Sequence, residues 1–290
     1  MAVSAPVPTR PLARLRRRFA RAPWAALIEA AARFGYVARG AVYVSVGAIA
    51  LLAALRLTPR AEGAVGALEA WGEWSLGIML LWLIGLGLYG FAAWRALQAF
   101  ADTERHGHDL RGLAIRAGQA ISGLTYGGLA VSVFGLIDAL GDLHEPDDRA
   151  ATRAAVDAAL HLPMGGLIVA AAGLFVLAAG LGNMARAAFD HFGRELDCDR
   201  PVRDWAGTVA RFGYAARGLA LVPAGGFLLS AGLHARASEA EGLGGALETL
   251  ADAPFGHAVL ALTGAGLVAF GLFAVAEAGL RPMRAPDPAA

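Results

Sequence analysis

The sequence predicts an all-α integral membrane protein, a six-helix bundle built from three pseudo-symmetric two-helix repeats. Apolar residues make up 57% of its 290 positions, charged residues only 17%, and glycine occurs 38 times, a composition typical of membrane proteins. Several apolar runs are long enough to cross a hydrocarbon core of about 30 Å as helices. Strands are not expected, because the runs lack the alternation of a β-barrel and lipid requires hydrogen bonds within each span.

Six apolar runs predict six membrane spans, and charged connections separate them. Only the first and fifth runs contain a charged residue, Arg39 and Arg217 respectively. The predicted spans, in chain order, are 34–55, 74–94, 117–137, 158–185, 212–235 and 253–276.

A short motif opens two of these spans and marks the repeats. The sequence Arg-Phe-Gly-Tyr-Val-Ala-Arg-Gly at 33–40 returns as Arg-Phe-Gly-Tyr-Ala-Ala-Arg-Gly at 211–218, and a degenerate copy occupies 116–123. This recurrence indicates three structural units. The predicted division is a basic cytoplasmic tail at 1–32, repeats of two spans each at 33–105, 106–190 and 191–281, and a second cytoplasmic tail at 282–290.

Between the two spans of each repeat lies a segment that predicts a short amphipathic helix. An acidic residue stands at the same place in each segment, at Glu69, Asp157 and Glu248, shortly before the glycine that opens the second span. We expect these helices to lie on the outer surface, with their apolar residues toward the bilayer and the acids in water.

The distribution of charge predicts the orientation. Every basic residue is an arginine, and the arginines gather in both tails and in the second and fourth connections, whereas acids crowd the odd-numbered connections. The positive-inside rule then places both termini in the cytoplasm, and the all-arginine, alanine-rich chain is typical of a bacterial inner membrane. The basic tail lacks the apolar core of a cleavable signal peptide. We interpret the tail as a cytoplasmic segment that contacts anionic lipids, and an organellar transit peptide is the alternative.

Glycine spacing predicts tight packing between the spans. Small residues along one helix face let neighbouring backbones approach closely, whereas a helix face in contact with lipid does not require small residues. The segment 85–90 matches the dinucleotide-binding fingerprint, but it lies inside a span, so we interpret its glycines as packing residues. Glycines recur at heptad spacing at Gly40 and Gly47, at Gly166, Gly173 and Gly180, and at Gly264 and Gly271.

Three positions weaken their helices at the same place in each first span: Ser45, Gly128 and Pro223. Pro223 removes an amide donor, Gly128 lowers helix propensity, and Ser45 can bond back to its own helix. Routine bending is one interpretation, and a pathway or hinge between the first, third and fifth spans is the other. We expect Tyr43 and Tyr126 to fill the space near these points.

Arg39 and Arg217 lie deeper in their spans than Arg33 and Arg211, where a charge is costly. We expect their side chains to snorkel to the cytoplasmic headgroups and to bond the carbonyls that end neighbouring even-numbered spans. The alternative is a site for an anion or a lipid headgroup formed by all four arginines. Glu277, at the inner end of the sixth span, is the acid placed to pair with either deep arginine.

Residues with metal or catalytic chemistry are sparse. His106 and His108 lie in the second connection, and His191 and the single cysteine, Cys198, lie in the fourth. Their spacing matches no closed zinc pattern, so we predict no metal site. No nucleophile stands beside a base in the way catalysis requires. We therefore predict no catalytic residues and no cofactor, and an enzyme is the least supported class. Nor is a nucleic-acid partner expected.

The recurring motif at 33–40 and 211–218 resembles a bacterial membrane-protein family known as domain of unknown function 1206. The resemblance extends from about Arg33 to Arg281 and implies three repeats of a two-helix module, but no activity. The middle copy departs from the pattern with Gln119 for tyrosine and Ser122 for the second arginine. A site with threefold symmetry would therefore be only two-thirds complete.

Two functions remain open. We favour a structural or interaction component of the cytoplasmic membrane, in contact with lipids and assembling with itself or other membrane proteins through glycine-lined faces. A small transporter or channel is the alternative. Transport pathways normally place ionisable groups at mid-depth, and the predicted spans hold few.

Overall fold

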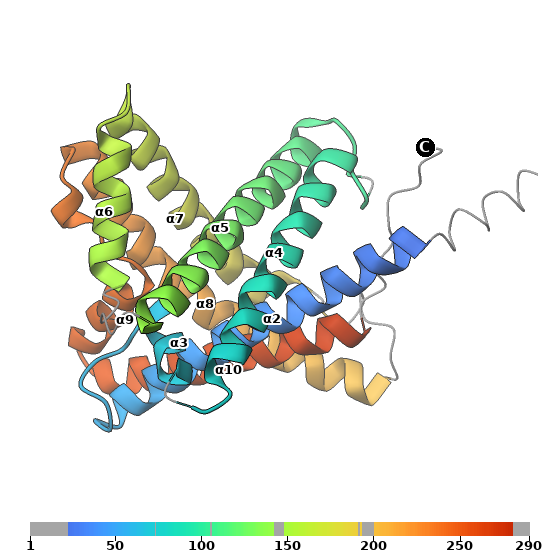
Figure 1. Ribbon diagram of the computed structural model, residues 1–290, viewed down its shortest axis with the longest axis horizontal. Coiled ribbons are helices and arrows are strands. Elements are labelled where there is room, and N and C mark those ends of the chain that lie inside the picture. The colour runs from blue at the N-terminus through green and yellow to red at the C-terminus, as the bar shows by residue number, and fades with distance from the viewer. Residues whose placement is uncertain are drawn as a thin grey trace, which may run out of the picture.

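A computed structural model of the chain describes residues 23–72, 74–104, 106–141, 148–190, 192 and 200–280, and this part is helical with no strand. Six of its helices are long and apolar enough to cross a membrane, so the protein is an all-helical, multi-pass membrane protein (Figure 1). The basic tail before Pro23, His191 and Cys198 lie outside the described residues. The long helices are α2 (Pro23–Ala54), α4 (Gly77–Ala101), α5 (Leu110–Gly141), α7 (Gly165–Phe189), α8 (Arg200–His234) and α10 (Gly256–Leu280).

Short helices follow the first long helix of each expected repeat: α3 (Ala64–Gly72), α6 (Asp148–Leu160) and α9 (Leu243–Asp252), with a 3-10 turn, η2 (Ala237–Glu239), before α9. The expectation that their apolar residues face the bilayer is wrong for α3 and α9. Leu68 and Leu247 are fully buried in the protein, because α3 packs on α2, α4 and α5, and α9 packs on α8 and α10.

Several predicted span boundaries differ from the helix ends; for example, the span predicted to end at 94 continues to Ala101. The span predicted at 158–185 begins inside α6, and α7 starts only at Gly165, after a turn with φ of 60° at Met164. The sixth span starts at Gly256 after a similar turn at Phe255. At the other end, α10 continues past the predicted end at 276 to Leu280, and Glu277 is buried.

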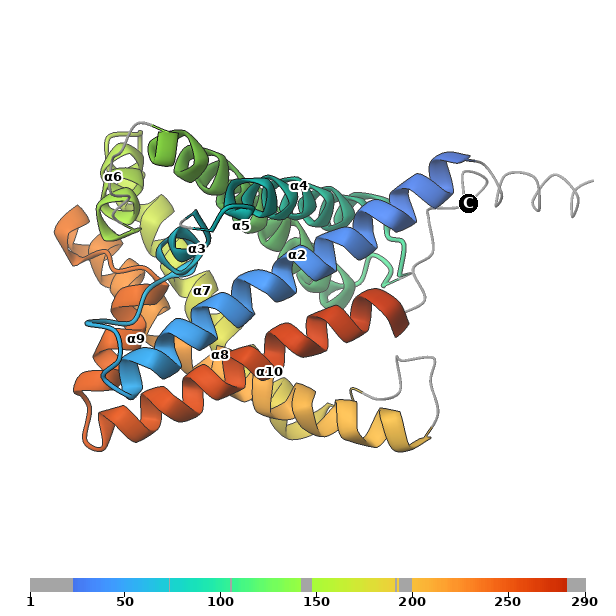
Figure 2. The same ribbon diagram turned by 60° about the horizontal axis from the view of Figure 1, so that its bottom comes forward.

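The heptad glycines let α2 and α10 pack backbone to backbone, which confirms the packing prediction. A Cβ atom added to Gly40 would lie 2.7 Å from the carbonyl oxygen of Gly271, and one added to Gly47 would lie 2.6 Å from that of Gly264. The two helices run side by side along their length (Figure 2). Within the fingerprint segment 85–90, a Cβ on Gly87 would meet the Cβ of Ala38 at 2.5 Å, so that segment also packs between helices.

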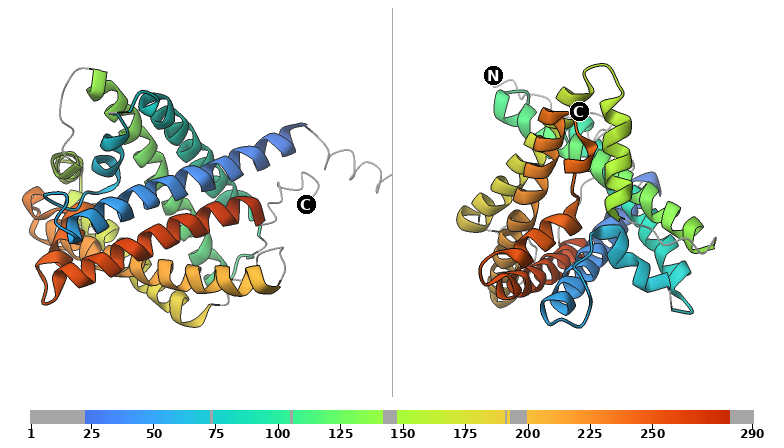
Figure 3. Two further views of the ribbon diagram at one scale, coloured as in Figure 1. Left: turned by 90° about the horizontal axis from the view of Figure 1, so that it is seen from below. Right: turned by 90° about the vertical axis from the view of Figure 1, so that its left-hand side faces the viewer.

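In the second and third units the first span packs on the second span of the unit before it, α5 on α4 and α8 on α7, and α2 of the first unit packs on α10 of the third. The α2–α10 pair lies between the other two, through contacts of α2 with α4 and of α10 with α8 (Figure 3). The described parts of α5 and α7 have no comparable contact and diverge from each other (Figure 1). The middle unit therefore differs from its neighbours, and the pseudo-threefold arrangement stays a prediction.

Candidate functional site

The guanidinium of Arg39 lies inside the bundle, where α2, α4 and α10 meet. Its Cζ atom lies 4.8 Å from the ring centroid of Phe270, 5.1 Å from that of Phe91 and 5.5 Å from that of Tyr36. The residue is 4% exposed. Cation–π contacts with three rings stabilise the positive charge, but rings do not replace the oxygen acceptors that a guanidinium normally binds.

Hydrogen bonding at Arg39 is incomplete. Its Nε atom is buried and finds no acceptor among the described residues. The facing carboxylate is Glu277, whose Oε2 lies 3.7 Å from Nη2 of Arg39, longer than a hydrogen bond. Both side chains are less than a tenth exposed. An arginine fork has five donors, so this site has donor capacity for an additional acceptor.

Arg217 of α8 approaches the same aromatic ring from the neighbouring pair of helices. Its Cζ lies 5.0 Å from the centroid of Phe270. Its Nε donates to the hydroxyl of Tyr43 at 2.8 Å, and its Nη1 donates to Oδ1 of Asn183 at 3.1 Å. The hydroxyl of Tyr126 in turn donates to that of Tyr43 at 3.3 Å. Side chains of α2, α5, α7, α8 and α10 thus meet in one polar cluster enclosed by aromatic rings.

The expectation that the deep arginines snorkel and bond helix-end carbonyls is wrong, because aromatic rings and neutral acceptors inside the bundle hold them instead. Arg33 makes the carbonyl contacts: its Nη1 donates to the carbonyls of Ala278 and Gly279 at the end of α10, and Nε and Nη2 bind Glu29. Arg116, at the equivalent place in the middle unit, donates to carbonyls at the end of α4.

The candidate anion set is therefore brought together only in part. Arg39, Arg217 and Glu277 meet near Phe270, whereas Arg33 lies at the end of α10 and Arg211 is exposed on α8. A site made of all four arginines does not form.

The three helix-softening positions occupy different environments. Ser45 is buried; its hydroxyl donates to the carbonyl of Ala41, as expected, and accepts from the indole of Trp71, both at 3.0 Å. Gly128 is exposed on α5, and a Cβ there would meet no atom within 4 Å. Pro223 lies inside α8 without ending it. Since Ser45 is buried and Gly128 exposed, they do not face a common interior space.

Tyr43 and Tyr126 are both buried, and their hydroxyl groups form a hydrogen bond with each other. Sequence reasoning missed the other members of the cluster, Asn183, Phe91 and Phe270. Two signals were present. Asn183 is a polar residue in the fourth apolar run, and Phe91 and Phe270 stand at the same place after the glycines that open α4 and α10.

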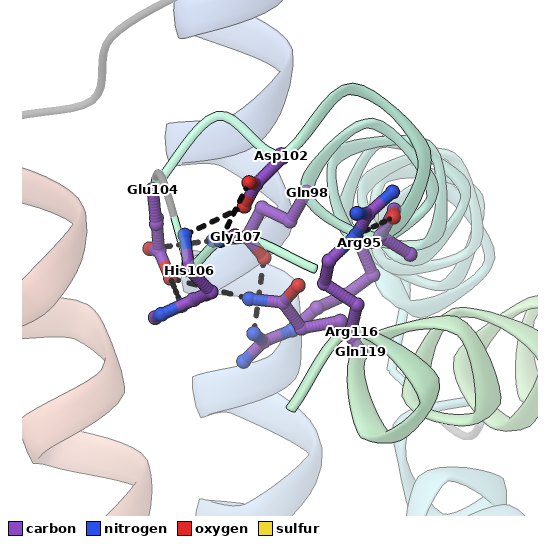
Figure 4. Close-up of polar contacts among 9 residues, drawn as sticks. Arg95, Gln98, Asp102, Glu104, His106, Gly107, Arg116 and Gln119 are labelled. Atoms are coloured by element: carbon purple, nitrogen blue, oxygen red, sulfur yellow. Dashed lines mark hydrogen bonds and ion pairs between the residues drawn. The ribbon is translucent and has the colours of Figure 1, made fainter. Parts of the chain in front are cut away.

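The departure of the middle motif from the pattern has a structural explanation in the loop between α4 and α5 (Figure 4). Gln119, which replaces the tyrosine, donates its amide to Glu104 Oε2 at 3.2 Å, and Gln98 of α4 donates to Oε1 at 2.8 Å. His106 lies 3.1 Å from the same carboxylate. In the middle unit, the residue at this motif position therefore connects α5 to α4 through the carboxylate of Glu104.

Asp102 stabilises this loop in its ionised form. It adopts the left-handed conformation that ends α4, and its carboxylate accepts from the amides of Gly107 at 2.9 Å and His106 at 2.8 Å. The hydrogen bond from Gly107, followed by that from His106, lowers the pKa of Asp102 below its ordinary value. The carboxylate therefore stabilises the loop fully above the unfolded-state pKa of about 4, and this contribution is lost as pH falls through the lower folded-state pKa.

We expect Asp102→Asn to increase the exchange rate of the Gly107 and His106 amides at neutral pH, because a neutral amide oxygen is a weaker acceptor. Hydrogen exchange with mass spectrometry measures this. The Asp138→Asn variant, which alters an exposed carboxylate near the far end of α5, should leave both amides unchanged. Equal exchange in the two variants would show that Asp102 does not hold the loop.

Comparison with known proteins agrees with this architecture. The family model described as Domain of Unknown Function (DUF1206) matches residues 34–102 and 212–281, two ranges that begin at the second residue of the motifs at 33–40 and 211–218. The chain is also 28% identical over 256 residues to an uncharacterized protein of Bacillus subtilis (strain 168), YxxB, across 87% of this chain and 90% of the relative. No solved structure matches the chain. The chain is therefore similar to the DUF1206 family in its first and last units.

Proposed function

We propose that the protein binds a small oxyanion between its helices, as a transporter or channel for anions. The observation that carries the proposal is the environment of Arg39: a guanidinium 4% exposed, with an Nε that has no acceptor among the described residues. Arginine forks match the oxygens of sulfate, phosphate and carboxylate groups. A bound oxyanion would supply the acceptors that the surrounding rings cannot.

The charge of the cluster supports the same conclusion. Arg39 and Arg217 carry two positive charges near one ring, and Glu277 carries one negative charge. A net positive charge inside a membrane span is costly unless it is balanced. Both arginines lie near the middle of their spans, Ala26–Ala54 and Asp204–His234. These positions support a transport function, because pathways normally place ionisable groups at mid-depth.

The proposed location is the bacterial inner membrane with both termini in the cytoplasm. Arginines cluster at the ends of the helices that carry the termini, and acids cluster between the two spans of each unit, which is the asymmetry that orients membrane proteins. In this orientation the motif arginines Arg33 and Arg116, which bond the ends of α10 and α4, lie on the cytoplasmic side.

Titration calorimetry in nanodiscs of zwitterionic lipid tests the proposal, with sulfate and phosphate as probes. We expect binding by the wild type and a loss of about tenfold or more in Arg39→Gln and in Arg217→Gln, because each removes a charged hydrogen-bond donor. Arg211→Gln removes an exposed arginine of the same motif and should bind like the wild type. Wild-type affinity in both interior variants would exclude the site. Sulfate flux into proteoliposomes would separate transport from binding alone.

The second candidate is a structural or interaction component of the membrane, alone or as a homo-oligomer. The close contact of α2 with α10 through Gly40 and Gly271, and the burial of Tyr43 and Tyr126, favour it. This function would be preferred if the wild type binds neither sulfate nor phosphate while Arg39→Gln and Arg217→Gln lower thermal stability. The arginines would then act as structural cross-links.

A further inference from the structure

The three pairs of long helices, α2 with α10, α5 with α4 and α8 with α7, contact each other in the same register. The last glycine of each motif copy marks this register: Gly40, Gly123 and Gly218. A Cβ atom added there would meet, on the facing helix, the carbonyl oxygen of Gly271 at 2.7 Å, of Ala92 at 3.2 Å and of Gly180 at 2.7 Å respectively. These three facing residues stand at the same distance along the chain from the glycines that open α10, α4 and α7. Residues of one pair can therefore be compared with their counterparts in the other two.

The α4–α5 pair keeps an arginine beside the motif, but on the other helix. The residue before the marker glycine is Arg39 in α2 and Arg217 in α8, whereas α5 has Ser122. The facing position holds Asn183 in α7, whose Oδ1 accepts from Arg217 at 3.1 Å. In α4 the same position holds Arg95. The arginine that the middle motif lacks is therefore replaced by one from the facing helix.

Arg95 lies directly against the middle motif. A Cβ atom on Gly123 would lie 3.3 Å from the Cβ of Arg95. Nη1 of Arg95 donates to Oε1 of Gln98 at 3.0 Å (Figure 4). Gln98 stands at the same place in α4 as Glu277 in α10, and Glu277 is the residue that faces Arg39. Arg95 and Arg39 thus have partners at equivalent positions of their facing or own helices.

Arg95 and Arg39 also share an aromatic ring. Their Cζ atoms lie 5.0 Å and 5.1 Å from the centroid of Phe91. The Nε atoms of both arginines are buried and find no acceptor among the described residues, and a ring does not replace an oxygen acceptor. Arg186, which lies over another ring of the cluster, differs because its Nε donates to Asp190 at 2.7 Å. Two buried donors without an acceptor in the described chain therefore lie at one ring.

We propose that Arg95 is the third arginine of the oxyanion site, in place of the arginine that the middle motif lacks at Ser122. The inference rests on the proposed function and adds a residue to its site. A tetrahedral oxyanion has several acceptor oxygens, and arginine forks bind them in more than one combination. An oxyanion beside Phe91 would supply an acceptor to Arg39 and to Arg95. Each of the three helix pairs then contributes one arginine to the site.

Titration calorimetry of the full-length protein in nanodiscs of zwitterionic lipid, with sulfate as the probe, tests the role of Arg95. We expect Arg95→Gln to lower sulfate affinity by about tenfold or more, because it removes a charged hydrogen-bond donor. The matched control is Arg116→Gln. Arg116 links the same two helices, since it donates from α5 to carbonyls at the end of α4, and this variant should bind like the wild type.

A double variant that combines Arg95→Ser with Ser122→Arg moves the arginine back to the motif position on α5. It should recover most of the sulfate affinity that Arg95→Gln loses, because the arginine stays at the same contact between α4 and α5. The exchange keeps the number of arginines at this helix pair, so it tests the inference even where Arg95→Gln fails to fold. Circular dichroism of each variant identifies those that are folded.

The outcomes separate the two proposals. Wild-type affinity in Arg95→Gln, together with a loss in Arg39→Gln, would overturn the role of Arg95 and leave the site of Arg39 and Arg217 standing. A folded double variant that binds no better than Arg95→Gln would overturn that role as well. So would an equal loss in Arg116→Gln, because a loosened α4–α5 contact would then explain both. Absence of sulfate and phosphate binding by the wild type would overturn the anion site itself, and the role of Arg95 with it.

Discussion

The Gly40→Leu substitution is expected to separate α2 from α10 and to unfold the bundle. A Cβ at this position would lie 2.7 Å from the carbonyl oxygen of Gly271 and 2.7 Å from the side chain of Val275. Backbone cannot rotate away as a side chain can, so the helices must move apart. Overpacking by one or two groups already costs about 1–3 kcal/mol, and leucine adds more volume. Gly40→Ala is expected to fall within that range and to remain folded.

Thermal unfolding in nanodiscs, followed by circular dichroism, measures both effects. The matched control is Gly135→Leu, on α5, where a Cβ would meet no atom within 4 Å. This control should keep the wild-type midpoint, because its side chain would point into open space in a helix that tolerates leucine well. Equal midpoints for Gly40→Leu and Gly135→Leu would show that the α2–α10 contact contributes little to the fold.

The helices were predictable from sequence because the length of an apolar run and the spacing of glycines depend on local pattern alone. Gly40, Gly47, Gly264 and Gly271 predicted the close contact that they make. The start of α7 was not predictable in the same way. Its preceding turn has a positive φ at Met164, where the usual glycine signal is missing.

The candidate site was predictable only in its charged members. The depth of Arg39 and Arg217 in their spans identified them as unusual, but their direction depends on rings contributed by distant helices. Phe91 and Phe270 stand at matching places after the glycines that open α4 and α10, but this match does not reveal whether a ring contacts a guanidinium or packs against lipid. We therefore predicted that the side chains of Arg39 and Arg217 reach the headgroups, whereas in the structure they contact aromatic rings inside the bundle.

Arg39→Met is expected to destabilise the folded protein by about 3–5 kcal/mol, because it removes one member of a buried ion pair with Glu277. Arg217→Met should cost less, because the two described hydrogen-bond partners of Arg217, Tyr43 and Asn183, are neutral. Denaturant unfolding in mixed micelles at neutral pH gives the free energies of the wild type and the two variants.

The double variant Arg39→Met/Glu277→Gln shows whether Arg39 stabilises the fold through its charge beside Glu277 or through its contacts with aromatic rings. Replacing both members of a buried pair by neutral groups of similar size is often close to neutral, so most of the stability lost in Arg39→Met should return. Failure to recover it would mean that the contacts of Arg39 with Tyr36, Phe91 and Phe270, and not its charge relation to Glu277, hold α2 in place. If Arg39→Met is instead as stable as the wild type but no longer binds sulfate, then Arg39 is retained for its ligand and not for the fold.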